Sequence, residues 1–570
     1  MAELNLAQLH ETVAAEVPDC ECLVQGERRL TYREVTERTR RLAHYLGDRG
    51  LGVKTPRSAL DSHESGQDHV ALYMHNCPEY MESMLGCFKA RAVPFNVNYR
   101  YVEEELLYLL RDAGATTMIF HAELAPMVAR LREQLPQLRV LIQVSDASGT
   151  PLLPGAIAYE DALAQSSAEP PELEWSPDDL YILYTGGTTG MPKGVLWRQA
   201  DVYMAALGGR NSRGVETPDL EKVRERARRT EARGGKRLLP PPPMMHGAAH
   251  WVAFHAFHTG ATVVMQEEVH RYDPHEVLAV AEREQVNGLL LVGDAFGRPL
   301  LDAVRRAKAD GSPYALASLE TITNSGAALS ADVKRGLMEA LPETTIVDAI
   351  GSSESGQQGV AVSSGGEAQT GTFALSPSAR VLSQDLDRVL QPGDDELGWL
   401  AQAGRVPLGY LGDADKTART FPVVDGVRYS VPGDRARFSA EGTVEVLGRD
   451  SVTINSGGEK IFAEEVEAAL KHHPEVYDVI VCGRPSERWG QEVCAIVQLR
   501  PGATPEEDAL KAEAEKHLAR YKLPKAFLFH EAIVRSPSGK PDYRWAKNLA
   551  RGNLARSAQE RLSSSRKSST

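Results

Sequence analysis

Residues 184–194 read YTGGTTGMPKG, a stretch of glycines, threonines and one lysine that begins at the end of the apolar run LYILYT. Successive backbone N–H groups in a glycine-rich turn form a nest for anions, and the hydroxyl and ammonium groups add donors for phosphate oxygens. The spacing differs from a Walker A loop, because two residues separate Gly190 from Lys193 and no hydroxyl follows the lysine. The composition also fits a flexible surface loop, so the rest of the chain must decide between these interpretations.

Composition restricts the class of protein. A chain of 570 residues is too long for one hydrophobic core, so at least two domains are expected. A net charge of -14 argues against a nucleic-acid surface, and six cysteines without a C-x-x-C pair indicate free thiols in a reducing compartment. No apolar run approaches the roughly 18 residues of a membrane span, and the N-terminus lacks a signal peptide's apolar core. We therefore expect a cytoplasmic protein without a membrane span.

The pattern of apolar runs predicts an α/β fold. Runs at 116–120, 139–144, 180–185 and 288–292 alternate with helical stretches, which is typical of buried parallel strands joined by crossover helices. From about residue 371 to residue 447 the sequence changes to short strands and turns, which predicts an antiparallel β lobe. Together these segments predict a large N-terminal domain over residues 1–449.

A small α+β domain is expected over residues 450–549. An amphipathic helix at 462–474 ends at a proline, two strand-like runs follow, and a second amphipathic helix begins near Pro505. Residues 550–570 are polar, basic and rich in serine, and we expect them to be a disordered tail.

Two further segments have unusual composition. The arginine-rich stretch 221–237 could contact an anionic ligand or a membrane, but its interspersed charges favour a solvated helix face. The segment 244–258 carries four histidines, with His246 and His250 four residues apart. This spacing could place metal ligands on one helical face, but the interleaved aromatic residues and the absence of cysteines and carboxylates favour an apolar pocket wall.

The glycine-rich loop resembles the phosphate loop of the adenylate-forming superfamily, which includes acyl-CoA synthetases, peptide-synthetase adenylation domains and luciferases. Further motifs follow in the order found in that superfamily. They are the adenine-binding turn NSGAAL (324–329), the segment IGSSES (350–355), the ribose-binding VPGDRARF (431–438), the hinge and hairpin LGRDSVTINSGGEKIFAEEVE (447–467) and the terminal segment YKLPKAFLFHEAIVRSPSGKPDYR (521–544). Six motifs in one order make a specific signal, whereas any one alone would be weak.

The resemblance implies a reaction in which a carboxylate attacks the α-phosphorus of ATP, pyrophosphate leaves and an acyl-adenylate forms. Both reactants are anions, so the site must neutralise charge. Catalytic roles are implied for Thr185, Lys540 and Glu354, with Lys540 bridging the α-phosphate and the carboxylate and Glu354 helping to hold Mg²⁺. The implied ATP- and AMP-binding residues are Thr185, Gly186, Gly187, Thr188, Thr189, Gly190, Lys193, Gly326, Ala327, Ala328, Gly351, Ser352, Ser353, Asp434 and Arg449.

A second step is implied, in which the thiol of coenzyme A displaces AMP. In this superfamily the small domain rotates about a hinge, for which Asp450 is the matching residue. Rotation would withdraw Lys540 and bring in the hairpin at Gly457 and Gly458, where the absence of side chains would admit the pantetheine arm.

The sequence departs from the superfamily's pattern at two positions of the Glu354 motif. Ile350 replaces an aromatic residue that would pack on adenine, and Ser353 replaces a threonine but keeps a hydroxyl group. At Gly351, acetate-activating relatives carry a tryptophan that closes the acyl pocket, so Gly351→Trp is expected to shift preference toward short acids. An open pocket walled by His246, Gly247, Trp251 and Gly351 favours a medium-chain, long-chain or bulky acid. The stretch NSGGEKIFAEEVE (455–467) especially resembles the matching stretch of bacterial fatty-acid and steroid-side-chain CoA ligases.

We therefore expect an AMP-forming acyl-CoA ligase with a carboxylic acid, ATP and coenzyme A as its substrates and no nucleic-acid partner. A homodimer is left open. Three alternatives remain: an adenylation enzyme that transfers to a carrier protein, a luciferase-like oxygenase, and a non-catalytic nucleotide-binding protein. The last is disfavoured because Glu354, Asp434 and Lys540 are all present.

Overall fold

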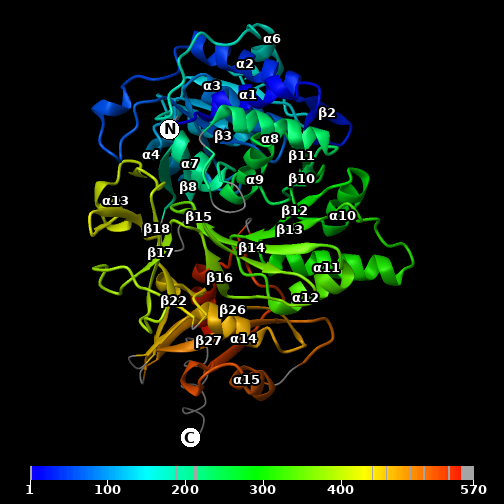
Figure 1. Ribbon diagram of the computed structural model, residues 1–570, viewed down its shortest axis with the longest axis vertical. Coiled ribbons are helices and arrows are strands. Elements are labelled where there is room, and N and C mark those ends of the chain that lie inside the picture. The colour runs from blue at the N-terminus through cyan, green and yellow to red at the C-terminus, as the bar shows by residue number, and fades with distance from the viewer. Residues whose placement is uncertain are drawn as a thin grey trace, which may run out of the picture.

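The computed structural model describes residues 3–185, 191–210, 215–217, 219–439, 441–456, 459–486, 489–504, 507–536 and 539–553. In Figure 1 the first third of the chain lies at the top, the large sheet crosses the middle and the C-terminal strands and helices lie at the bottom. Among the residues described, none of the helices combines the length and the apolar character that crossing a membrane requires.

A five-stranded parallel sheet forms the N-terminal part. Its strands, in spatial order, are β4 (Val93–Asn96), β3 (His69–Tyr73), β5 (Thr117–His121), β6 (Val140–Val144) and β7 (Ile157–Ala158). Helices α4 (Glu103–Asp112) and α5 (Ala125–Leu131) pack on one face. Between the other face and the large sheet lie α1 (Leu6–Glu16), α2 (Tyr32–Asp48), α3 (Pro78–Lys89), α7 (Gln199–Ala206) and α9 (Gly247–Phe257). Every residue of β3 and β5 is buried, as predicted for parallel strands covered on both faces.

A 15-stranded sheet joins the second half of the large domain to the antiparallel lobe. Its parallel part consists of β1 (Glu21–Gln25), β11 (Thr262–Met265), β10 (Arg237–Leu239), β12 (Gly288–Leu291), β13 (Thr321–Ser325) and β14 (Thr345–Ser352), with β2 (Arg28–Thr31) antiparallel at the edge. Helices α10 (Pro274–Arg283), α11 (Asp294–Ala309) and α12 (Ala331–Ala340) cover one face with apolar side chains.

The chain direction changes at β15 (Gly356–Ser363), which runs antiparallel to β14. The lobe continues through β16 (Thr372–Leu375), β17 (Ala379–Leu382), β18 (Gly398–Ala403), β20 (Val423–Val424), β21 (Val427–Ser430), β22 (Asp434–Phe438) and β23 (Val444–Arg449), and all of its pairings are antiparallel. The predicted antiparallel lobe is confirmed.

One predicted parallel strand is antiparallel. The run 180–185 forms β8 (Leu180–Thr185), but its partner is β9 (Lys193–Arg198), with Thr185 opposite Lys193. Because Thr185 and Lys193 are paired in an antiparallel ladder, the next strand along the chain lies beside β8 and is not a parallel strand reached through a crossover helix. Strand β19 (Gly409–Tyr410) adds to the other edge of β9.

The arginine-rich stretch forms α8 (Leu220–Ala232), which packs on α1. Its buried side chains are Val223 and Ala227, while Arg224 and Arg228 form ion pairs with Glu16 of α1. This arrangement agrees with a solvated helix face.

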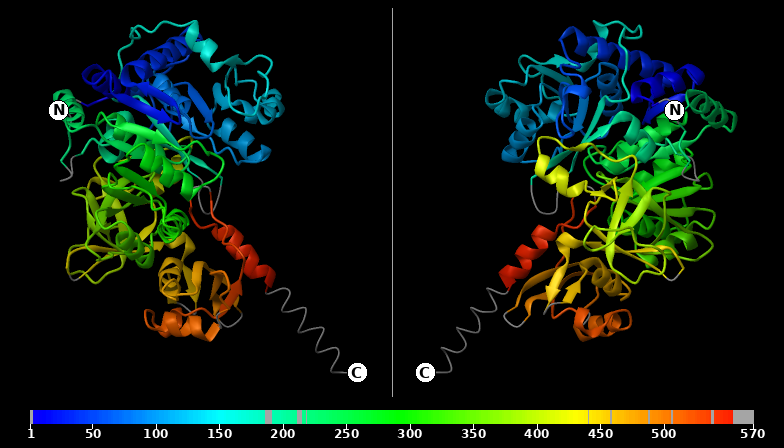
Figure 2. Two further views of the ribbon diagram at one scale, coloured as in Figure 1. Left: turned by 90° about the vertical axis from the view of Figure 1, so that its right-hand side faces the viewer. Right: turned by 60° about the vertical axis from the view of Figure 1, so that its left-hand side comes forward.

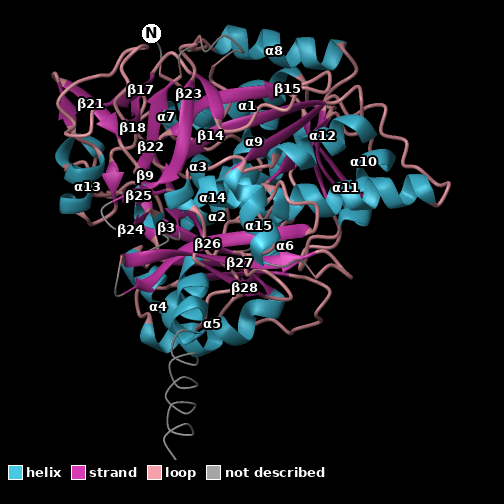
Figure 3. Ribbon diagram, turned by 90° about the horizontal axis from the view of Figure 1, so that it is seen from below, coloured by secondary structure: helices cyan, strands magenta, loops and turns pink. Residues whose placement is uncertain are grey.

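The C-terminal part has its own core, which runs from Val452 to Ala550. Its sheet contains β25 (Glu459–Ile461), β24 (Ile454–Ser456), β27 (Gly490–Leu499), β26 (Val476–Ser486) and β28 (Ala526–Phe529), which Figure 3 shows from below together with α14 (Ala463–Leu470) and α15 (Glu507–Glu515). A last helix spans 543–553 and ends the described chain in Figure 2. Ala550 is buried in this helix, so regular structure extends past residue 549, and the remainder of the predicted tail lies outside the described residues.

Candidate active site

The turn predicted to bind adenine follows β13 and is fixed by one amide side chain. Asn324 accepts a hydrogen bond from the backbone N–H of Gly293 (2.7 Å) and donates to the carbonyl of Ala327 (3.0 Å). Gly326 has φ +82°, which a residue with a side chain rarely adopts. A Cβ atom at Gly326 would lie 3.7 Å from Lys540 Cε, so the turn and the predicted catalytic lysine are neighbours. The carbonyl of Ala328 accepts from the N–H of Asp294 at the start of α11.

The predicted magnesium ligand Glu354 lies in the turn between β14 and β15. The Tyr410 hydroxyl donates to Glu354 Oε1 (2.8 Å), and the Ser430 hydroxyl donates to the Glu354 carbonyl (2.6 Å). Ser352 accepts from the Glu354 N–H through its hydroxyl (3.2 Å), and the Ser353 carbonyl accepts from the Trp197 indole (2.8 Å). No lysine or arginine of the described residues forms an ion pair with the Glu354 carboxylate. This carboxylate is therefore oriented but not neutralised, as a ligand for a hard cation should be.

The backbone of the neighbouring strand leaves no room for a side chain at Gly351. It lies at a register shift between β14 and β15, and a Cβ atom there would come within 2.1 Å of the Gly356 carbonyl oxygen. A side chain at Gly351 would thus collide with the neighbouring strand before reaching any open space. In a Gly351→Trp variant the backbone would have to shift before the ring could enter an acyl pocket, and the expected change in acid preference stays a prediction.

The predicted ribose site contains a paired acid and base. Asp434 at the start of β22 and Arg449 at the end of β23 are directly opposite in the ladder, and Arg449 Nε lies 3.3 Å from Asp434 Oδ1. The negative charge of Asp434 is the main cause that raises the pKa of Arg449, and Glu354 adds to it. Arg449 therefore stays protonated, and Asp434 balances its charge within the pair.

Lys540 reaches this site from the C-terminal domain. Its backbone N–H donates to the Ser536 hydroxyl (3.2 Å), and its side chain extends among groups of the large domain while keeping contact with solvent. The surrounding protein lowers the pKa of Lys540, the charge of Arg449 lowers it further, and the charges of Glu354 and Asp434 oppose the shift. Lys540 thus lies beside the Gly326 turn, and charges of residues far away in the sequence act on its ammonium group.

The phosphate loop is anchored at both ends, although Gly186, Gly187, Thr188, Thr189 and Gly190 lie outside the described residues. Thr185 ends β8 and Lys193 begins β9. The Lys193 ammonium group forms an ion pair with Asp413 (2.6 Å), the N-cap of α13 (Ala414–Thr420), and this hydrogen bond is the main cause that raises the pKa of Lys193.

The predicted acyl wall is the start of α9, with His246 as its N-cap and Gly247 as its first residue. His246 Nε2 is buried without a hydrogen-bond partner, and burial, with the nearby charge of Lys540, lowers the pKa of His246 to about 3. Trp251 donates to the Tyr181 hydroxyl (2.8 Å), which also contacts His250. Neutral rings therefore line this wall, and in the described chain no cluster of metal-binding side chains includes the histidines of 244–258.

The hinge candidate Asp450 follows β23 directly and begins a 3₁₀ turn, with its N–H bonded to the Gly433 carbonyl (3.0 Å). Gly457 and Gly458, predicted to line the path of coenzyme A, lie outside the described residues.

Two contributors were missed by the sequence reasoning. Tyr410 orients Glu354 from a segment that carries no motif, and Asn96 binds the Tyr184 carbonyl (2.8 Å) and the Met245 carbonyl (2.7 Å), which joins the phosphate-loop strand to the acyl wall. An asparagine at the end of the apolar run VPFN is a usable signal, because polar residues at strand ends often serve sites.

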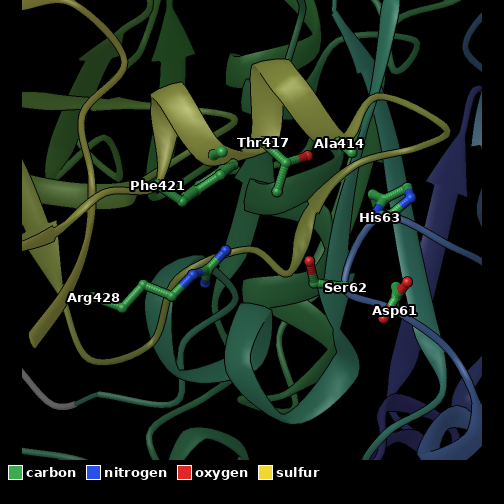
Figure 4. Close-up of a pocket in the computed structure, with 8 residues that line it drawn as sticks. Asp61, Ser62, His63, Ala414, Thr417, Phe421 and Arg428 are labelled. Atoms are coloured by element: carbon green, nitrogen blue, oxygen red, sulfur yellow. The ribbon is translucent and has the colours of Figure 1, made fainter.

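A separate hollow of about 340 Å³ lies beside α13 (Figure 4). Its lining comes from the loop around Ser62, from α13 and from Arg428, and none of the predicted site residues contributes to it.

Comparison with known proteins covers both parts of the chain. The pattern of the AMP-binding enzyme family matches residues 10–405, and that of the AMP-binding enzyme C-terminal domain matches residues 465–540. The medium-chain acyl-CoA ligase Mig of Mycobacterium avium is 54% identical over 542 residues, 95% of this chain and 97% of that protein. The 3-oxocholest-4-en-26-oate–CoA ligase of Rhodococcus rhodochrous is 41% identical over 549 residues, 96% of each chain. The crystal structure of the anthranilate CoA ligase AuaEII with anthranoyl-AMP has the same fold, with a TM-score of 0.79 at 20% identity over 97% of this chain and 99% of that one.

Proposed function

Because the chain belongs to the AMP-binding enzyme family and is an AMP-forming acyl-CoA ligase, we propose that its substrate is a medium-chain carboxylic acid. Long-chain and steroid acids are secondary candidates. The relative with 54% identity is named for medium-chain acids, whereas the relative with 41% identity is named for a steroid acid. The neutral aromatic wall around His246 and Trp251 supports an apolar acyl group.

The position of Lys540 carries the proposed mechanism. It projects from the small domain toward the Gly326 turn, where the charges of Glu354, Asp434 and Arg449 of the large domain act on it. An ammonium group at this place can bridge the substrate carboxylate and the α-phosphate, which reduces the repulsion between two anions as the oxygen–phosphorus bond forms. Pyrophosphate leaves as the bond to the acid forms, and the product is an acyl-adenylate.

The donor set fits Mg²⁺. Glu354 offers a carboxylate that forms no direct ion pair with a lysine or arginine of the described residues, and oxygen ligands are those that Mg²⁺ prefers. When bound with ATP, Mg²⁺ would supply charge neutralisation at the phosphates. The protein's own part is to hold Glu354 through Tyr410 and Ser430. We place the reaction in the cytoplasm, where ATP and coenzyme A are both available.

The substrate assignment can be tested by mass spectrometry of acyl-CoA and AMP after incubation with Mg-ATP, coenzyme A and a panel of acids. The panel contains acetate, octanoate, palmitate, benzoate and a steroid-26-oate. Octanoyl-CoA with stoichiometric AMP is the expected product in greatest yield. AMP release without any thioester would move the assignment to another acyl acceptor, and turnover confined to the steroid acid would overturn the medium-chain proposal.

A buried ion pair joins the two domains in the arrangement that places Lys540 beside the Gly326 turn. Lys471 at the end of α14 places its Nζ 3.1 Å from Asp294 Oδ2 at the start of α11. Asp478 Oδ1 lies 3.6 Å from Lys471 Nζ, and the Asp478 carboxylate accepts hydrogen bonds from Nε and Nη2 of Arg535, each at 2.7 Å. Both partners are largely buried, with 10% and 2% of the side chains of Lys471 and Asp294 exposed. Rotation of the small domain would separate the pair, which we propose favours the adenylate-forming arrangement.

Lys471→Met should slow acyl-adenylate formation about tenfold or more, because each 1.4 kcal/mol lost from this arrangement reduces its population about tenfold. Transfer from preformed acyl-adenylate to coenzyme A should keep its rate. The two half-reactions are measured separately by pyrophosphate exchange and by thioester formation. Lys516→Met, which removes an exposed ion pair with Glu513 in the same domain, is the matched control. An equal loss in both half-reactions would contradict the proposal.

A further inference from the structure

Imidazole and carboxylate groups converge at a second place, away from the proposed nucleotide site. His75 follows β3, His121 ends β5, Glu123 comes two residues later and Asp146 follows β6. Because the carboxyl ends of parallel strands meet at one edge of a sheet, these four side chains come together there. His270, in the loop after β11 of the large sheet, faces them from the other side.

Three of these residues offer ligand atoms at short range. His75 Nε2 lies 2.8 Å from Glu123 Oε1, and His270 Nδ1 lies 4.0 Å from Glu123 Oε2. All three ligand atoms lie within 4.8 Å of one another. Metal–ligand bonds of about 2.0–2.2 Å put tetrahedral ligands roughly 3.4 Å apart. The His270 side chain is 60% exposed, so it has room for the small movement that would complete this geometry.

The described part of the cluster contains imidazole nitrogens and carboxylate oxygens that can bind a metal ion, and no lysine or arginine forms an ion pair with Glu123. Among the described residues, Glu123 has ion-pair partners in the two imidazoles and none in a lysine or arginine side chain. The His75 side chain is 6% exposed, and its Nε2 atom faces the Glu123 carboxylate. Imidazole nitrogens and carboxylate oxygens are common zinc ligands.

The other two members have positioning roles. His121 Nδ1 accepts a hydrogen bond from the backbone N–H of His75 (3.1 Å), and Asp146 Oδ2 accepts from the backbone N–H of Glu123 (2.8 Å). Each therefore fixes the backbone of one proposed ligand, which is how outer partners of metal sites orient the ligands.

We propose that His75, Glu123 and His270 bind a divalent transition-metal ion of the zinc class, with water completing the coordination. Two imidazoles and one carboxylate suit Zn²⁺ better than the hard cations Mg²⁺ and Ca²⁺. Such an ion would clamp the five-stranded sheet to the large sheet. It would also brace the acyl wall, since Asn76 beside His75 accepts from the Met244 N–H (2.6 Å) and donates to the Pro242 carbonyl (3.1 Å), just before His246.

The test uses tag-free, full-length protein freed of metal with a chelator and titrated with ZnCl₂ by calorimetry. One site is expected, with a rise in Tm on binding because the ion favours the folded state. Glu123→Gln should weaken Zn²⁺ binding more than about 100-fold, and Asp146→Asn should weaken it about 10- to 100-fold. Replacing Zn²⁺ with Co²⁺ gives an independent readout, namely visible absorption bands that the His75→Ala variant should lack.

His472→Ala is the matched control, because His472 and His517 form a stacked pair of rings, 4.2 Å apart, in the C-terminal domain. Removing it should leave the tight Zn²⁺ site unchanged. The proposal is overturned if wild type and Glu123→Gln bind Zn²⁺ equally, or if His472→Ala alone abolishes binding. Neither outcome depends on whether the protein forms acyl-CoA.

Discussion

Lys540→Ala is expected to slow acyl-adenylate formation about 10²- to 10³-fold, the usual effect of removing one positioned donor to a developing charge. The lysine side chain comes from the small domain and lies against the Gly326 turn, and the charges of Glu354 and Arg449 act on it, so alanine at this position removes the ammonium group that would lie between phosphate and carboxylate. Transfer of preformed acyl-adenylate to coenzyme A should remain within a few-fold of wild type, because the proposed rotation withdraws Lys540 before that step.

Pyrophosphate exchange measures the first half-reaction, and thioester formation from synthetic acyl-adenylate measures the second. Lys525→Ala removes an exposed lysine of the same domain and should change neither rate. If Lys540→Ala reduced both half-reactions by the same factor, the lysine would act in binding the nucleotide and not in forming the adenylate.

Glu354→Gln should reduce adenylate formation about 100-fold and raise the Mg²⁺ concentration needed for half-maximal rate. The amide oxygen can still accept from Tyr410, so the turn between β14 and β15 should keep its shape while losing one negative charge. An unchanged Tm would show that the loss is chemical and not structural.

The Mg²⁺ dependence separates this role from a purely structural one. Rates of pyrophosphate exchange are measured across a Mg²⁺ titration for wild type, Glu354→Gln and the exposed control Glu367→Gln. A Glu354→Gln variant with the wild-type Mg²⁺ dependence would remove Glu354 from the set of metal-binding candidates.

Local patterns predicted much of the fold. Buried apolar runs indicated β5, β6 and β12, and the change to short strands and turns after residue 371 indicated the antiparallel lobe. The order of motifs also predicted that Lys540, Glu354, Asp434 and the Gly326 turn share one site. The fold predictions succeeded because each depends on residues that are close in the sequence. The shared site stays a prediction, which the short distance between Gly326 and Lys540 supports.

Pairings between distant segments could not be predicted in the same way. The direction of β8 depends on whether β9 folds back on it, and a buried apolar run is the same in either orientation. Tyr410 and Lys471 act through partners more than 50 positions away, and no periodicity identifies such partners. At Gly351 the reason for glycine is the nearby Gly356 carbonyl, which becomes visible only when the register shift is known.

One continuous ladder of backbone hydrogen bonds carries both the Gly326 turn and the pair of Asp434 and Arg449, since β13 and β22 belong to the same sheet. The residues of the large domain that would bind the nucleotide are therefore held in fixed positions relative to one another. Only the residues that the small domain brings to them would change between the two steps. An acyl-adenylate is a mixed anhydride that water destroys. On this arrangement it need not be released between its formation and its consumption, so the cell would be spared a reactive intermediate free in solution.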